Sequence, residues 1–290
     1  QLLEWLERYT FPEEKKYADL EYAKSQYDRV VKEGLSLGTT CCVYFGSVHA
    51  EATKVLMDVC EANNQKAYVG KVCMDVRCPV DYRDIDVHNC LKENQSLIDH
   101  SRTLESVEYI LTPRFAPICS TEMMLGLGKL SKEHNLMIQS HISENKGEIA
   151  WMSDLYPKKS YTQVYDDHKL LNAKTLMAHA IYLEDAELDL FKERDARIAH
   201  CPTSNYFLKS GILDARRILQ KGIKMGLGSD VSGGWTMNMV EVMRCAVLAS
   251  QSVAFHKNDN GEEYEPLTGT EAFYLATKGG AVCLDREQEM

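Results

Sequence analysis

The sequence lacks any long apolar run and any excess of basic charge. No hydrophobic segment approaches the roughly 18 residues of a membrane-spanning helix. The opening QLLEWLERYTFPEEKK has no charged start, apolar core and cleavage site, so it predicts no signal peptide. The 290 residues include 33 Lys and Arg against 43 Asp and Glu, a formal net charge of −10. This balance argues against nucleic acid or an anionic membrane as partner, because both select basic surfaces.

A spaced cysteine framework is also missing, although the chain has ten cysteines. Cys41 and Cys42 are adjacent, and Cys73, Cys119 and Cys201 lie in or beside apolar runs. In a long chain without a signal peptide, such cysteines are expected to be reduced core thiols. The expected location is therefore cytoplasmic.

Several motifs and boundaries are absent as well. The chain has no GxGxxG or P-loop, no HExxH, and no H-x-E…P-C-x-x-C pattern. No Pro/Gly/Ser linker, low-complexity tract or close repeat divides it. We therefore expect one domain over residues 1–290, a length close to the roughly 250 residues of a (β/α)₈ barrel.

What the sequence does have is a series of short apolar runs separated by helical patterns. The runs do not alternate strictly, as is typical of buried parallel strands. They cover residues 38–46, 67–73, 106–114, 135–141, 174–180, 196–202 and 223–230. Helical patterns cover residues 51–65, 121–135, 183–195 and 211–222, the last ending at Gly222, a suitable C-terminal stop. Such βαβ repetition predicts an α/β fold with a parallel sheet.

Polar residues at the carboxyl ends of the runs distinguish between two architectures with parallel strands, a barrel and an open sheet. They are Arg114, His141, His179, His200 and Asp230. In a barrel, all strand ends converge on the face that carries the active site. In an open doubly wound sheet, only the ends beside the switch point converge. We therefore predict a (β/α)₈ TIM-like barrel.

The segment QSHISEN contains the sharpest candidate pair. His141 ends a strand, and Glu144 follows three residues later. A neutral imidazole is a standard zinc ligand, and a nearby carboxylate can move protons. The alternative is a histidine bonded to backbone beside an exposed glutamate.

Two further strand ends extend this pair. His179 ends MAHA, and Asp230 lies in GLGSDVSGG, where Gly226 and Gly228 permit close backbone approach. A structural hydrogen bond for His179 and a helix cap at Asp230 are the alternatives. The order histidine, histidine, aspartate along the strand series matches a metal-dependent hydrolase with a polarised water.

The segments AHCPTSN and TPRFAP supply the remaining candidates. His200 ends its strand, and Asn205 could cap a helix or contact a ligand. Arg114 beside Phe115 suits a flat, hydrogen-bonding ligand, with an ion pair beneath a loop as the alternative.

On these residues the chain resembles the guanine deaminases, a family of the amidohydrolase superfamily of metal-dependent barrel enzymes. The similar stretches include LLEWLERYTFP, GTTCCVYF, LTPRFAP, IQSHISEN, TLMAHA, IAHCPTSN and GLGSDVSGG. TPRF and QSHISEN are the most specific of them. The resemblance implies conversion of guanine and water to xanthine and ammonia, one zinc ion per subunit, and a homodimer.

The resemblance also implies individual roles. His141 and Asp230 would be zinc ligands, and Asp230 would take a proton from the attacking water. His179 would hold that water, and Glu144 would carry protons to the purine ring and to the leaving amine. Arg114 and the Phe115 backbone would bind the carbonyl side of guanine, and His141, Glu144 and Asp230 would also contact the substrate. His200 and Asn205 would line the site.

One expected feature is missing from the sequence. The family carries a His-x-His pair at the end of its first strand and a small flanking β-sandwich, and this chain contains no His-x-His. The expected barrel therefore lacks its first strand and the β-sandwich. We therefore expect a fragment of a longer enzyme that binds zinc weakly and is impaired in activity, since a catalytic zinc needs three protein ligands and a water. A relative acting on another amino-heterocycle and a non-catalytic binding barrel are the two alternative functions.

Overall fold

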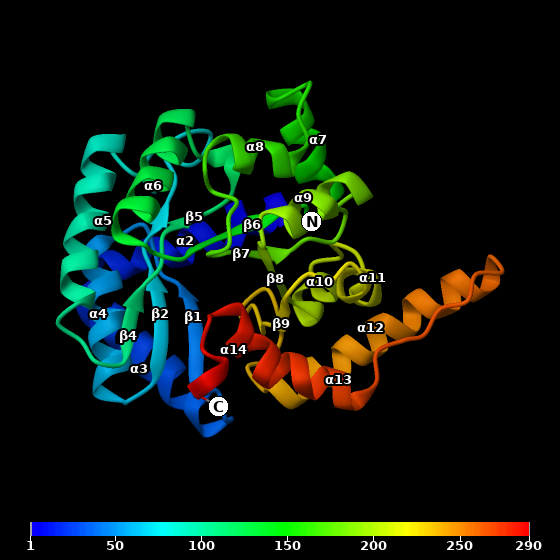
Figure 1. The fold of residues 1–290 in the computed structure, drawn as a ribbon. Coiled ribbons are helices and arrows are strands. Elements are labelled where there is room, and N and C mark those ends of the chain that lie inside the picture. The colour runs from blue at the N-terminus through cyan, green and yellow to red at the C-terminus, as the bar shows by residue number, and fades with distance from the viewer. Residues whose placement is uncertain (1, 290) are drawn as a thin grey trace. The chain divides into compact units, whose positions relative to one another are not determined.

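The computed structural model describes residues 2–289 (Figure 1). Contacts between residues divide them into two compact units. The N-terminal unit comprises residues 3–140 and 167–170, and the C-terminal unit comprises residues 2, 141–166 and 171–289.

Parallel strands form the centre of the N-terminal unit. One sheet has the order β1-β2-β4, with Cys41 opposite Lys66 and Ala67 opposite Val107. A second, two-stranded parallel sheet pairs β3 with β5. The bounds are β1 (Cys41–Phe45), β2 (Lys66–Gly70), β3 (Val72–Cys73), β4 (Val107–Tyr109) and β5 (Thr112–Pro113).

Four long helices pack in sequence order beside these strands (Figure 1, left). They are α3 (Leu20–Ser36), α4 (Ala50–Ala62), α5 (Val87–Ser101) and α6 (Thr121–His134). Asp19, Asp86 and Ser120 cap three of them by accepting hydrogen bonds from first-turn N–H groups. The shorter turns of this part of the chain are α1 (Leu2–Trp5), η1 (Leu6–Thr10), α2 (Phe11–Glu14), η2 (Lys15–Ala18) and η3 (Ala116–Ile118).

The C-terminal unit carries the later strands. The sheet order is β6-β7-β8-β9, and β8 pairs in parallel with both of its neighbours. The bounds are β6 (Ile138–Ile142), whose last two residues belong to this unit, β7 (Thr175–His179), β8 (Arg197–His200) and β9 (Met225–Leu227). Its helices are α7 (Lys146–Leu155), α8 (Tyr161–Asp167), α9 (Asp185–Glu193), α10 (Pro202–Phe207), α11 (Ala215–Gln220), α12 (Met239–Asp259), α13 (Gly269–Tyr274), η4 (Leu275–Gly279), α14 (Gly280–Cys283) and η5 (Glu287–Glu289).

The predicted elements are confirmed. Each of the seven apolar runs contains a strand, although residues 67–73 and 106–114 each break into two short strands. The four helical patterns correspond to α4, α6, α9 and α11, and Gly222 has the positive φ of 72° expected of a C-terminal stop. Close approach at Gly226 is also confirmed, because a Cβ there would lie 2.9 Å from the Gly280 Cα.

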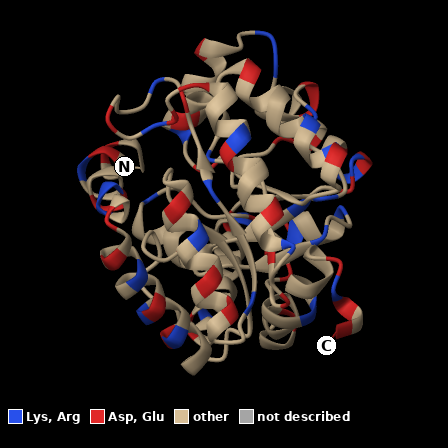
Figure 2. Ribbon diagram, turned by 90° about the vertical axis from the view of Figure 1, so that its left-hand side faces the viewer, with Lys and Arg blue, Asp and Glu red and all other residues tan. Residues whose placement is uncertain are grey.

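The positions of the cysteines agree only in part with the prediction that they are core thiols. Seven cysteines are buried, Cys42 and Cys78 are half-buried, and Cys41 is exposed, so Cys41 is not a core thiol. Figure 2 shows acidic and basic residues interspersed along the same helices, as is typical of a solvated surface. Among residues 2–289, no helix has both the length and the apolar character of a membrane crossing.

Candidate active site

Three of the predicted strand-end residues meet in the C-terminal unit. His141 and His179 lie at the ends of β6 and β7, and Asp230 follows Leu227, the last residue of β9. Their ligand atoms all lie within 4.8 Å of one another. His179 and Asp230 have positive φ values of 72° and 48°. Such backbone strain in residues other than glycine is concentrated at functional sites.

His179 is buried between two carboxylates. Its Nε2 lies 3.5 Å from Glu144 Oε2 and 3.8 Å from Asp230 Oδ2. Its Nδ1 bonds Asn205 Oδ1 at 2.9 Å. An amide oxygen only accepts, so Nδ1 donates and Nε2 faces the carboxylates. Burial disfavours the imidazolium, but the negative charges of Glu144 and Asp230 outweigh it and raise the pKa of His179.

Glu144 is a buried acid, which excludes the exposed glutamate considered as an alternative. Its side chain is 3% exposed, and Ser210 Oγ donates to its Oε1 at 2.9 Å. Burial raises the pKa of Glu144 to about 7, an effect that His179 opposes and Asp230 reinforces. A carboxyl group with a pKa near neutrality can both give and accept a proton at physiological pH.

A second buried glutamate holds the turn that carries Glu144. Glu148 Oε2 accepts hydrogen bonds from the backbone N–H groups of Glu144 (2.8 Å) and Asn145 (3.4 Å). Asn145 Oδ1 accepts in return from the Glu148 N–H, which completes a capping box on α7. Tyr161 donates to the other Glu148 oxygen at 2.6 Å.

Glu148 and Ser210 are not among the residues predicted from the sequence. The pattern Asn145-x-x-Glu148 is a recognisable capping-box signature and could have revealed the first. Ser210 lies 66 residues from Glu144, and no local pattern relates the two.

Asp230 lies in a tight loop rather than at a helix start. The next helix, α12, is capped by Asn238, which excludes the capping role for Asp230. A Cβ on Gly233 would lie 2.8 Å from Asp230 Oδ2 and 2.7 Å from Ser204 Oγ. Glycine is therefore needed at position 233 for the carboxylate to keep its place.

His200 is fully buried at the end of β8. Neither of its ring nitrogens has a hydrogen-bond partner among the described residues, and the same holds for Asn205 Nδ2 and Ser204 Oγ. Burial and the neighbouring His179 lower the pKa of His200 to about 3, so it is neutral. Buried polar atoms without partners commonly bond water or a ligand.

The donor set at His141, His179 and Asp230 fits zinc, which takes imidazole nitrogen and carboxylate oxygen. The first two rings stack at 5.5 Å between centroids, and Tyr165 donates to the His141 carbonyl oxygen at 2.8 Å. The two histidines and the carboxylate therefore approach one common point from three strand ends.

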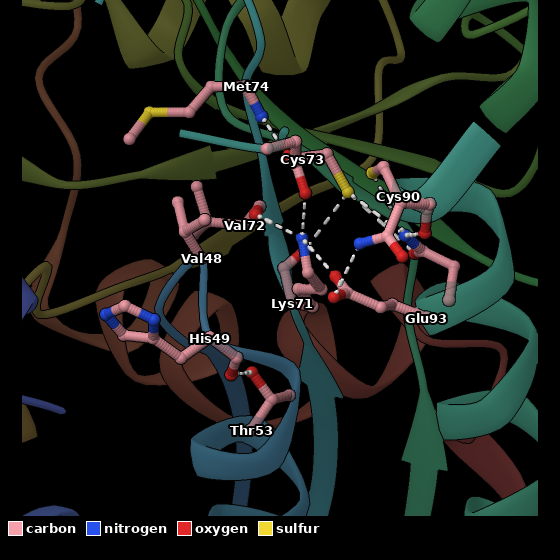
Figure 3. Close-up of polar contacts among 12 residues, drawn as sticks. Val48, His49, Thr53, Lys71, Val72, Cys73, Met74, Cys90 and Glu93 are labelled. Carbon is pink, nitrogen blue, oxygen red and sulfur yellow. Dashed lines mark hydrogen bonds and ion pairs between the residues drawn. The ribbon is translucent and has the colours of Figure 1, made fainter. Parts of the chain in front are cut away.

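A second group in the N-terminal unit, formed by Cys73, Asp84 and Cys90, fits a metal less well. Lys71 Nζ lies 3.4 Å from Glu93 Oε2 (Figure 3). It also lies 2.5 Å from Asp84 Oδ1. The lysine ammonium therefore already supplies a positive charge to this group.

Arg114 and Phe115 belong to the N-terminal unit and follow β5 directly. Both are buried. The two terminal nitrogens of Arg114 donate to the two carboxylate oxygens of Glu14 at 2.6 and 3.0 Å. The ion pair considered as an alternative therefore exists, and its partner Glu14 is not among the residues predicted from the sequence.

Comparison with known proteins identifies the family. The model of the amidohydrolase family matches residues 1–289. The chain belongs to the amidohydrolase family. Among its relatives, the guanine deaminase of Dictyostelium discoideum is 44% identical over 283 residues, which cover 97% of this chain and 62% of the relative. The human guanine deaminase is 40% identical over 292 residues, covering 100% of this chain and 63% of the relative.

A solved structure agrees with these sequence relatives. Guanine deaminase from C. acetobutylicum with bound guanine superposes with a TM-score of 0.94 at 40% identity, covering 98% of this chain and 68% of that one. The α/β fold of the amidohydrolase barrels is thereby confirmed against the open doubly wound sheet. The chain spans less than two thirds of the length of the curated relatives named above.

Proposed function

We propose that this chain forms most of the barrel of a zinc-dependent guanine deaminase, which hydrolyses guanine to xanthine and ammonia. The group formed by the buried Glu144 and His179 and the half-buried Asp230 carries this proposal, because it places proton carriers beside a zinc-compatible donor set. The guanine deaminases among the relatives supply the substrate.

His141 and Asp230 would hold the zinc ion, with His179 beside them. When bound, the ion would supply the Lewis acidity that makes a water molecule nucleophilic at neutral pH. Asp230 would accept a proton from that water. His179, oriented by Asn205, would hold the water through Nε2.

Glu144 would move the proton that the reaction needs. Deamination requires protonation of a ring nitrogen and then of the departing amine, and one carboxyl group can serve both steps if it gains and loses a proton readily. The pKa of about 7 at Glu144 matches that requirement. Ser210 fixes one oxygen of the carboxyl group and so restricts its rotation.

Arg114 and the Phe115 backbone would bind the carbonyl side of guanine. A guanidinium offers several N–H donors in one plane, which matches the edge of a flat heterocycle. The purine would be the small-molecule partner.

We also propose a homodimer and a cytoplasmic location. Large apolar side chains are exposed on α12 and α13, and an exposed apolar surface of this kind commonly marks a subunit contact. They include Leu248, Phe255, Phe273 and Tyr274. The ten cysteine thiols support a reducing compartment.

The test of the proposed function is xanthine formation by the complete gene product, with zinc content measured on the same sample. Glu144→Gln should lower kcat by roughly 10²- to 10⁴-fold, because general acid–base catalysis contributes about that much. Glu193→Gln, a change at an exposed glutamate, should leave kcat unchanged.

Four results would contradict the proposal in whole or in part. If zinc-loaded protein forms no xanthine, the proposed activity is wrong. If another amino-heterocycle is turned over faster than guanine, the proposed substrate is wrong. Guanine turnover that survives Arg114→Ala unchanged would remove the guanine-binding role of Arg114. Binding of purines without any turnover would favour the non-catalytic barrel.

The 290-residue chain by itself should bind zinc weakly, because the His-x-His pair of the family is not among its residues. Metal analysis of this chain beside a version extended at both ends tests that expectation. Equal, stoichiometric zinc in both would overturn it.

A further inference from the structure

Arg114 is held by an unusually complete set of contacts. Its guanidinium forms a two-bond fork with Glu14, a residue 100 positions away in the sequence. Tyr82 donates its hydroxyl to Glu14 Oε2 at 2.7 Å. The Phe11 ring lies 5.2 Å from Arg114 Cζ, and the Tyr82 ring lies 5.9 Å from the Phe11 ring.

Each contact removes a different freedom of the guanidinium. The paired bonds to one carboxylate fix the plane of the guanidinium and its rotation within that plane. The aromatic ring of Phe11 supports one side of that plane. Tyr82 fixes the carboxylate itself, so the restraint does not end at Glu14. The backbone of Arg114 is tied as well, because its N–H donates to the Cys73 carbonyl oxygen at 3.1 Å.

We propose that Glu14 is a positioning residue that sets the orientation of Arg114 for the carbonyl edge of the substrate. This inference rests on the proposed function, since it takes Arg114 as a guanine-binding residue. Glu14 bonds the two terminal nitrogens of Arg114, and nothing in the proposed function places Glu14 itself on the substrate. Its effect on the substrate is therefore indirect and passes through Arg114.

The chain offers a matched ion pair for comparison. In the C-terminal unit, Arg216 forms the same kind of fork with Glu271, at 2.6 and 2.9 Å. The effect of losing any forked ion pair can therefore be separated from the effect of losing the pair between Glu14 and Arg114. Glu271 has no place in the proposed site.

The test is a kinetic comparison in the complete, zinc-loaded protein. Glu14→Gln should raise the KM for guanine about tenfold, since misplacing a binding group by about 1 Å costs up to two orders of magnitude, with kcat changed less. Glu271→Gln should leave KM unchanged. Tyr82→Phe, which keeps the fork and removes one contact to Glu14, should raise KM by a smaller factor.

A double-mutant cycle separates positioning from a merely structural role. In an Arg114→Lys background, where the fork is already lost, Glu14→Gln should add no further increase in KM. An unchanged KM in Glu14→Gln would overturn the inference. Increases in KM from Glu14→Gln and Arg114→Lys that multiply in the double variant would also overturn it, because Glu14 would then act independently of Arg114.

Failure of the proposed function gives a different result. If the unaltered, zinc-loaded protein forms no xanthine, the proposed function and this inference both fall. If it forms xanthine and Glu14→Gln behaves as the unaltered protein does, the inference alone falls.

Discussion

At the scale of single residues, the acids and histidines of the site couple its stability to pH. Glu144 has its pKa raised by burial from 4.5 to about 7, and the pKa of His179 is raised by the two neighbouring carboxylates against the effect of burial. Both groups therefore bind protons more tightly in the folded chain than in the unfolded chain. Folding is then favoured at low pH, and the advantage is lost as the pH rises through the folded pKa values.

This predicts that Glu144 contributes a loss of stability to the metal-free protein between pH 5 and pH 8, of roughly 2 to 3 kcal/mol, since one pKa unit corresponds to about 1.4 kcal/mol. His200, with its lowered pKa of about 3, contributes the opposite slope over the lower part of that range, so the Glu144 contribution is measured as a difference between variants. Urea unfolding with a chelator present, at pH 5 and at pH 8, compares the unaltered protein with Glu144→Gln. The change in the free energy of unfolding between the two pH values should differ by that amount, and the exposed-site variant Glu193→Gln should match the unaltered protein. The same change with pH in Glu144→Gln and in the unaltered protein would contradict the prediction.

The residue scale also shows what the sequence could and could not reveal. His141, His179 and Asp230 were found because polar residues end apolar strands, a local signal. Glu148 had a local signature in its capping box. Ser210 and Glu14 act on Glu144 and Arg114 across 66 and 100 positions, and such contacts exist only once the chain has folded.

At the scale of elements, the loop after β9 determines where the Asp230 carboxylate lies. Gly233→Ala should displace that carboxylate, because the added methyl group would lie 2.8 Å from Oδ2. We expect zinc affinity to fall by roughly 10-fold or more, as when the support of a metal ligand is disturbed. Competition with a chromophoric chelator measures the affinity.

The control for this change is Gly269→Ala at the start of α13, where an added Cβ meets nothing within 4 Å. It should bind zinc as the unaltered protein does. Equal affinities in the two variants would show that the Asp230 loop tolerates the methyl group.

A buried ion network ties β2 and β3 to α5 in the N-terminal unit (Figure 3). Lys71 is fully buried and contacts Asp84, Glu93 and the Val72 carbonyl oxygen. Lys71→Met would leave the buried Asp84 carboxylate without its cation, and breaking such a pair costs about 3 to 5 kcal/mol. Denaturant unfolding measures the loss, with Lys54→Met at an exposed position as control.

Adding Asp84→Asn to Lys71→Met should restore part of the lost stability, because the unpaired charge is then gone. The amide oxygen can still accept the bond from the Met74 N–H, which Asp84 Oδ2 accepts at 2.9 Å. A loss below about 1 kcal/mol for Lys71→Met would show that the network contributes little to stability.

At the scale of the whole molecule, the fold was more predictable than the site. Seven strands and four helices were read from apolar runs and caps, because hydrophobic burial follows local periodicity. The barrel was predicted from polar residues at the strand ends, and the relatives confirmed it against the open sheet. The sequence did not predict that apolar side chains of α12 and α13 are exposed, because a helix on the surface and a helix covered by a partner have the same hydrophobic periodicity.

Those side chains lead to the last prediction, on assembly. Val240, Leu248 and Phe255 are exposed and spaced eight and seven residues apart, so they lie on one side of α12. Charges placed there by the double change Leu248→Glu and Phe255→Glu should convert a homodimer into monomers, because a stable interface excludes unpaired charge from its apolar centre. Light scattering coupled to size exclusion measures the mass. Ile85→Glu, at an 87% exposed position of the N-terminal unit, is the matched control and should stay dimeric. A double variant that remains a dimer would place the interface elsewhere, and an unaltered protein that is monomeric at every concentration would overturn the proposed homodimer.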